Sequence, residues 1–107
     1  MITGLKPEKA DYYKKAHAAV WPGVLEKIKD CNIRNYSIFL REMEGRFYLF
    51  SYMEYTGEDF EADMQRMAKD PVTQLWWKEM HPCMIPLSPA LAKDSIWSHM
   101  EEVFHQD

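Results

Sequence analysis

Two consecutive stretches of alternating side chains, residues 33–41 and 46–55, constrain the fold of this chain most strongly. The four residues between them end in glycine, which is typical of a β-hairpin. An antiparallel strand with one face in water alternates apolar with polar side chains. The second stretch is apolar or aromatic on both faces, with Phe47, Leu49 and Met53 on one and Tyr48, Phe50 and Tyr52 on the other. We therefore expect both faces of the sheet to be covered.

A chain of 107 residues forms one domain, residues 1–107, and supplies helices for only one face of such a sheet. The other face would remain a large apolar patch, and such patches usually mark an interface. The two-faced strands therefore predict a homodimer that buries sheet against sheet, with two-fold symmetry.

Helical spacing of apolar residues flanks the hairpin on both sides. Before it, we expect one helix from about residue 7 to 19 and a second from 22 to 31, because Trp21-Pro22 forces an extended backbone between them. Asn32 is a suitable left-handed stop. After the hairpin, Thr56 to Asp59 has the form of a capping box for a helix beginning at Phe60. Asp70-Pro71 starts another helix, which ends before His81.

The two ends of the chain complete the plan. Residues 1–5 are expected to form a short strand, and residues 81–94, with three prolines, an extended loop. Residues 95–105 fit either a helical stripe or strand alternation, and their periodicity slightly favours a helix. The order β-α-β-β-α with an undecided last element points to the ferredoxin-like βαββαβ plan of an α+β protein.

Charge and motif content narrow the possible partners. Thirteen basic and seventeen acidic residues give a formal charge of −4 with no basic run, which argues against nucleic acid and anionic membranes. No stretch is long enough to span a membrane and no signal peptide opens the chain, so we expect a cytoplasmic protein whose Cys31 and Cys83 stay reduced. The four histidines show no metal-binding spacing, and no glycine-rich cofactor loop is present.

Tyr13 and His17 are the first candidate site residues. They stand four residues apart in a helical segment, so they share one face near the end of a helix. A phenol beside an imidazole can bind a hydroxylated molecule and transfer its protons. Taken alone, however, such a pair is more often a half-buried structural Tyr and His with local hydrogen bonds.

Trp76-Trp77 is the second candidate feature. Adjacent helical residues point about 100° apart, so we expect one indole to pack inward and the other to line a groove or interface. Indole faces suit the C–H surfaces of sugars, but two large core and rim residues would give the same pattern. Tyr36 lies on the apolar face of its strand, where core packing is its first explanation.

Several motifs in order make the chain similar to a known family. It resembles the L-rhamnose mutarotases, small proteins that interconvert the anomers of L-rhamnose. The matching residues are Tyr-Lys-Lys-Ala-His at 13–17, Val-Trp-Pro at 20–22, Asn-Tyr-Ser-Ile-Phe-Leu at 35–40, Leu-Phe at 49–50, Glu54, Asp-Pro-Val-Thr-Gln-Leu-Trp-Trp-Lys at 70–78, Met80 and Met-Glu-Glu-Val-Phe at 100–104.

The resemblance implies a ferredoxin-like fold that dimerises through its sheets as a dimeric α/β barrel, with a last strand around 100–104. It implies His17 as the proton-donating catalytic residue, no metal and no organic cofactor. Its sugar-contacting residues match Tyr13, Tyr36, Trp76 and Trp77. The first strand is several residues shorter than in the family, so either Met1 is not the natural start or this edge of the sheet is weakened.

The function that follows is interconversion of the anomers of L-rhamnose, or of a close 6-deoxy sugar, by acid/base ring opening and reclosure. In this scheme His17 protonates the ring oxygen, and Tyr13 is its positioning donor or partner. Two other interpretations keep the same scaffold. One is a non-catalytic sugar-binding or sensory module, and the other a cofactor-free or haem-degrading monooxygenase, because fold alone does not fix function.

Overall fold

A four-stranded antiparallel sheet forms one layer of the protein. The computed structural model describes residues 1–88 and 95–107. Along the sheet the strands follow the order β2-β3-β1-β4, formed by β1 (Ile2–Leu5), β2 (Ile33–Met43), β3 (Arg46–Tyr55) and β4 (Met84–Ile85). With helices after β1 and β3, this order is the ferredoxin-like βαββαβ arrangement, which confirms the expected α+β fold class.

The helices begin and end close to the expected residues. They are the 3-10 helix η1 (Pro7–Lys9) with α1 (Ala10–His17), then α2 (Pro22–Asp30), α3 (Phe60–Lys69) and α4 (Pro71–Met80). Asp70 caps α4 as expected, because its carboxylate accepts a hydrogen bond from the Thr73 amide at 2.9 Å. The prediction that Thr56 begins a capping box for α3 is wrong. Asp59 itself caps α3, by accepting from the Ala62 amide at 3.1 Å.

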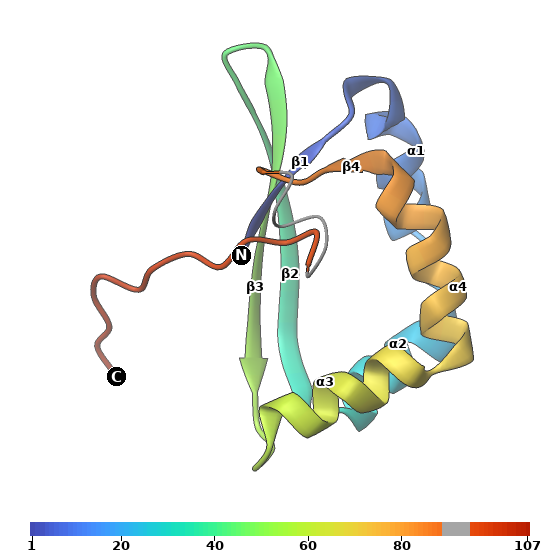
Figure 1. Cartoon of the computed structure of the whole chain (residues 1–107), viewed down its shortest axis with the longest axis vertical. Helices are drawn as coiled ribbons and strands as arrows, with labels where there is room; N and C mark the ends of the chain where they lie inside the picture. Colours follow the sequence, from blue (N-terminus) through green and yellow to red (C-terminus); the bar gives the residue numbers. More distant parts are fainter. Residues whose placement is uncertain (89–94) are drawn as a thin grey trace.

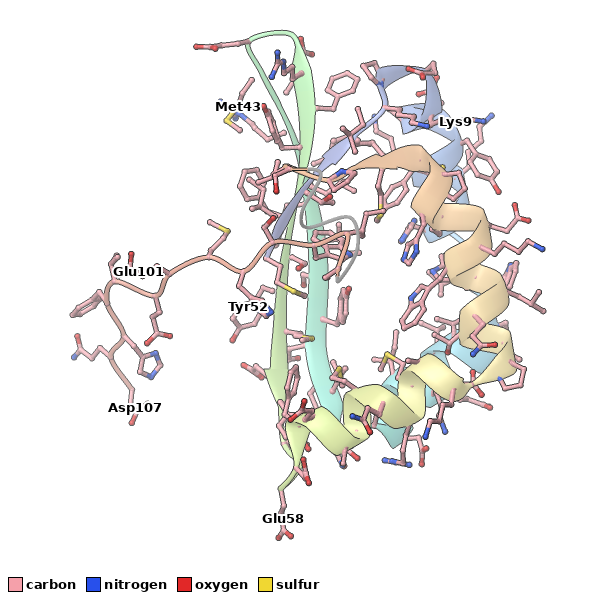
Figure 2. All side chains as sticks on the ribbon, in the orientation of Figure 1. Lys9, Met43, Tyr52, Glu58, Glu101 and Asp107 are labelled. Atoms are coloured by element: carbon pink, nitrogen blue, oxygen red, sulfur yellow. The ribbon has the colours of Figure 1, made fainter. Side chains whose placement is uncertain are left out.

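All four α-helices cover the same face of the sheet (Figure 1). Between the two layers lies an apolar core built around Leu5 and Leu49, which are each 1% exposed. On the opposite face, large side chains are in contact with solvent. Phe39 is 60% exposed and Tyr52 55%, and Figure 2 shows Met43 and Tyr52 pointing away from the helices. The expectation that helices cover only one face is therefore confirmed.

A β-bulge in β2 decides which of its side chains face the helices. Arg34 pairs with Glu54 and Ser37 pairs with Tyr52, so Asn35 and Tyr36 together oppose a single residue of β3, Met53. Asn35 adopts the left-handed conformation, with φ at 48°. In a regular strand, residues three positions apart point to opposite faces. Because of the extra residue, Ile33 and Tyr36 instead lie on the same face.

The last strand lies earlier in the chain than expected. The segment from His81 was expected to be a loop, but it contains the 3-10 helix η2 (His81–Cys83) and then β4, which pairs with β1. The remainder of that expected loop, 89–94, falls outside the described residues. Ser98 adds an isolated bridge to Ile2. β1 therefore lies inside the sheet, and the expectation that its shortness weakens an edge is wrong.

The prediction of a last strand around residues 100–104 is also wrong, and so is the helix that the periodicity of residues 95–105 favoured. Residues 99–107 have neither conformation and extend away from the helical layer (Figure 1). Val103 is 86% exposed and Phe104 78%, so the apolar side chains of this segment have nothing to pack against among the described residues. Among the helices of the described residues, none is both long and apolar enough to cross a membrane.

Candidate active site

A cavity of about 250 Å³ lies between the end of α1 and the sheet. The helix contributes Tyr13 and His17, which lie one turn apart as their spacing predicts. Strands β2 and β3 contribute an apolar wall. Among the described residues, the lining consists of Tyr13, Lys14, His17, Ala18, Ile38, Leu40 and Leu49. A group able to transfer protons at neutral pH thus faces an apolar wall across a space of monosaccharide scale.

The imidazole of His17 is held in one tautomer. Its Nδ1 lies 2.9 Å from the backbone carbonyl oxygen of Tyr13, and a carbonyl only accepts hydrogen bonds, so Nδ1 carries the proton. Nε2 is left with a lone pair and no partner among the described side chains and backbone. Burial lowers the pKa of His17, and the bond to the Tyr13 carbonyl opposes this only in part. At neutral pH the ring is therefore uncharged, and its basic nitrogen is available to a ligand.

Tyr13 is buried beside this ring, with only 4% of its surface exposed. The two rings stack with centroids 4.0 Å apart. Burial raises the pKa of the Tyr13 hydroxyl far above its usual range, and the nearby Tyr36 raises it further. Within the described part of the chain this hydroxyl has no hydrogen-bond partner. It therefore stays protonated and has a donor to offer.

Trp76 completes an aromatic chain at the site. Its ring packs edge-on against His17, with centroids 5.2 Å apart, and only 7% of its surface is exposed. Trp21 packs edge-on against the other side of Trp76, also at 5.2 Å. Trp21 was not among the site residues predicted from the sequence, in which Trp21-Pro22 was interpreted as the break between two helices. Its position four residues after His17 was a signal that it would lie nearby.

Trp77 and Tyr36 lie beside this chain of rings. Trp76 is the inward member of the tryptophan pair, whereas Trp77 is half-buried and stacks on His81 with centroids 5.7 Å apart. Tyr36 keeps 37% of its surface exposed, and burial raises the pKa of its hydroxyl. The structure thus brings Tyr13, His17 and Trp76 into one chain of contacts and Tyr36 close to Tyr13. Trp77 packs against the core instead, and neither it nor Tyr36 is among the described lining residues of the cavity.

A second cavity, of about 290 Å³, opens near the β2–β3 hairpin and β4. Among its described lining residues the polar side chains are Arg46 and Tyr48, and none is a histidine, a carboxylate or a cysteine. In the parts of the chain that the structure describes, no group of three metal-ligating side chains lies close together. Acid/base chemistry in these parts of the protein is thus best supported at the His17 cavity.

Comparison with known proteins adds a family to this geometry. A family model described as L-rhamnose mutarotase matches residues 1–106. The L-rhamnose mutarotase of Oceanobacillus iheyensis is 35% identical over 106 residues, which cover 99% of this chain and 94% of the relative. That of Listeria monocytogenes serotype 4b is 41% identical over 83 residues, which cover 78% and 75% of the two chains.

A solved structure shows the same fold. The crystal structure of an L-rhamnose mutarotase from Formosa agariphila matches with a TM-score of 0.72 at 23% identity, over 99% of this chain and 94% of that one. Fold, whole-chain family match and close relatives agree. The chain belongs to the L-rhamnose mutarotase family.

Proposed function

We propose that this protein interconverts the α and β anomers of L-rhamnose, or of a close 6-deoxy sugar, with His17 as the catalytic residue. One observation carries the proposal: the uncharged imidazole of His17, fixed by the Tyr13 carbonyl at 2.9 Å, lines a cavity of about 250 Å³. Relatives that match nearly the whole chain are named for this activity, which supports the same conclusion.

The reaction needs one proton removed and one added. Nε2 of His17 accepts the proton of the anomeric hydroxyl, and the imidazolium then gives a proton to the ring oxygen as the hemiacetal opens. Rotation about the C1–C2 bond and the reverse transfers close the other anomer. Nδ1 keeps its proton throughout, because the Tyr13 carbonyl holds it. A general acid/base of this kind contributes about 10²- to 10⁴-fold in rate.

The aromatic residues bind and orient the sugar in this scheme. Tyr13 donates its unpartnered hydroxyl to a sugar oxygen. Trp76 lies against the edge of His17 and restricts its ring, and Tyr36 and Trp77 line the approach. The apolar side chains Ile38, Leu40 and Leu49 provide a surface for the 6-deoxy methyl group. No step in this scheme uses a cofactor.

The same proposal includes a homodimer formed through the open sheet face. Phe39, Tyr52 and Ile85 are 60%, 55% and 47% exposed there, and a patch of this kind usually marks an interface. A second copy has the same patch, so a two-fold axis covers both at once. We also place the protein in the cytoplasm, where its two free, buried cysteines remain reduced.

Saturation-transfer NMR on equilibrated L-rhamnose tests the activity. The protein should accelerate exchange between the two anomer signals, and His17→Ala should lose most of that acceleration. His105→Ala is the matched control, because this exposed histidine lies in the C-terminal segment and should leave the rate unchanged. Equal exchange with and without the protein would refute the proposal. A sugar-induced change in tryptophan fluorescence without exchange would instead indicate a non-catalytic sugar-binding protein.

A further inference from the structure

Ser51 is a polar residue on the helix-facing side of β3, next to the apolar wall of the cavity. It lies on β3 between Leu49 and Met53, and alternation along the strand places all three on the face covered by the helices. Its cross-strand partner is Ile38. Since Ile38 and Leu49 both line the cavity, Ser51 stands next to two of its wall residues.

The hydroxyl of Ser51 is buried without a hydrogen bond. Its Oγ is shielded from solvent and finds no partner in the part of the chain that the structure describes. The backbone does not explain the residue either, because the Ser51 amide and carbonyl are both bonded to Met1 and would be so with any side chain. A buried hydroxyl without a partner destabilises the folded protein, so its presence asks for another explanation.

Tyr13 has the same property on the opposite wall. Its hydroxyl is also buried and unpartnered within the described residues, and it belongs to the helix that faces β3 across the cavity. Ser51 is not itself a described lining residue, but it adjoins Ile38 and Leu49 on the wall opposite Tyr13. A polyhydroxylated ligand in the cavity would pair two such unsatisfied hydroxyls on facing elements. Ser51 was absent from the sequence-based candidates, since its position in the strand alternation was that of an apolar residue.

We propose that Ser51 is a specificity-determining residue whose hydroxyl hydrogen-bonds one ring hydroxyl of the bound sugar. This inference rests on the proposed function and adds to it a contact that distinguishes sugars differing in one hydroxyl. Both oxygens are shielded in the free protein, so the entering sugar displaces the side chains above them. The hydroxyl of Ser51 can donate or accept, and it orients the sugar without taking part in proton transfer.

Kinetics of Ser51→Ala with a set of sugars test the proposal. For L-rhamnose the variant should raise KM roughly threefold to tenfold, the usual effect of one lost neutral hydrogen bond, with kcat little changed. One monodeoxy analogue, lacking the contacted hydroxyl, should bind the variant and the natural protein equally. The thermal midpoint of the ligand-free variant should stay level or rise, because the substitution removes an unsatisfied group.

Ser98→Ala is the matched control. Ser98 also has a buried hydroxyl with no partner in the described chain, but it lies on the other side of the sheet. It pairs with Ile2, and the alternation along β1 places the side chain of Ile2 on the open face. Its KM for every sugar should be unchanged. If Ser51→Ala has a lower thermal midpoint and its KM rises by the same factor for all sugars, the residue has a structural role and the proposal is overturned. An unchanged KM for all sugars would also overturn it.

These outcomes are separate from those that test the activity. If the natural protein fails to accelerate anomer exchange, sugar dissociation constants from tryptophan fluorescence replace KM in the same comparison. Ser51→Ala should then weaken L-rhamnose by the same factor and leave the deoxy analogue unaffected. If the natural protein does not accelerate anomer exchange, only the catalytic proposal is refuted. If Ser51→Ala affects L-rhamnose and the deoxy analogue equally, only the role of Ser51 is refuted.

Discussion

Tyr13 contacts His17 twice, through its backbone and through its side chain. The carbonyl oxygen of Tyr13 lies 2.9 Å from Nδ1, and its ring stacks on the imidazole with centroids 4.0 Å apart. The first contact fixes the tautomer. The second covers one face of the ring and adds to the burial that lowers the pKa of His17. Tyr13 thus fixes which nitrogen of His17 is basic and contributes to the burial of the ring, although its carbonyl hydrogen bond partly opposes the lowering of the pKa.

The activity should depend on pH through His17. Because its pKa is lowered from the ordinary value of 6.5, the uncharged form dominates at neutral pH. We expect kcat/KM for anomer exchange, corrected for the spontaneous rate, to rise with pH through an apparent pKa below 6.5 and then to level off. NMR exchange rates between pH 4.5 and about 8 measure this. A rate that falls as the pH increases over this range would show that the imidazolium is the reactive form.

Removal of the Tyr13 hydroxyl should weaken sugar binding more than folding. Tyr13→Phe keeps the ring that stacks on His17 and removes an oxygen that has no partner in the described chain. We expect kcat/KM to fall by roughly tenfold and the urea midpoint to change little. Tyr12→Phe is the control, since Tyr12 is 43% exposed and its hydroxyl donates to Glu79 on the protein surface. Equal kinetic losses in the two variants would contradict the assignment.

Folding should depend on pH through Asp63. Its carboxylate accepts hydrogen bonds from Tyr55, Asn32 and Arg66, and these hold its pKa at about 2. A carboxylate with a lowered pKa stabilises the fold above its unfolded-state pKa, and this contribution disappears as the pH falls through the folded-state value. The difference in unfolding free energy between the natural protein and Asp63→Asn should be largest above pH 4.

That difference should shrink as the pH falls toward 2, where the carboxylate of the natural protein becomes protonated. Urea unfolding at a series of pH values measures it. The exposed Asp11 provides a comparison, because Asp11→Asn removes a carboxylate that accepts no side-chain hydrogen bond in the described structure. If both substitutions give the same pH profile, the network around Asp63 does not carry the effect.

A charge on the open sheet face should dissociate the proposed dimer. Phe39 is 60% exposed on that face, and a glutamate in its place would be buried without a partner in the interface. Sedimentation should give a dimer for the natural protein and a monomer with intact circular dichroism for Phe39→Glu. Leu25→Glu should remain a dimer, since Leu25 is equally apolar and 53% exposed but lies on α2. A natural protein that stays monomeric at all concentrations would refute the dimer.

The parts of the fold that local rules determine could be predicted from the sequence. Helix α4 begins at Pro71 and ends at Met80 because a capping aspartate and a proline mark its start, and β3 has the bounds that its alternation predicts. The strand at Met84–Ile85 is only two residues long, and it forms because β1 offers it an edge. Such pairing depends on the tertiary structure, which no local pattern reveals.

The candidate site was predictable to a similar extent. Helical spacing alone placed Tyr13 and His17 on one face, and the structure keeps them in contact. The tautomer of His17, the contact of Trp21 with Trp76 and the unpartnered hydroxyl of Ser51 depend on how separate elements pack. For the C-terminal segment, the apolar pattern has no packing partner within the described residues, so it indicated a strand that the structure does not form.

The bulge at Asn35 and Tyr36 affects how reliably the chain finds its native pairing. In most sheets the contrast between an apolar and a polar face rejects a strand that has slipped by one residue. Here β3 is apolar or aromatic on both faces, so the contrast comes only from β2, which has Arg34, Ser37 and Arg41 on its outer face. The left-handed backbone of Asn35 adds a second constraint, because it fixes where the extra residue of the bulge lies. A β-branched residue at this position would make misregistered, aggregation-prone molecules compete with the native ones during folding.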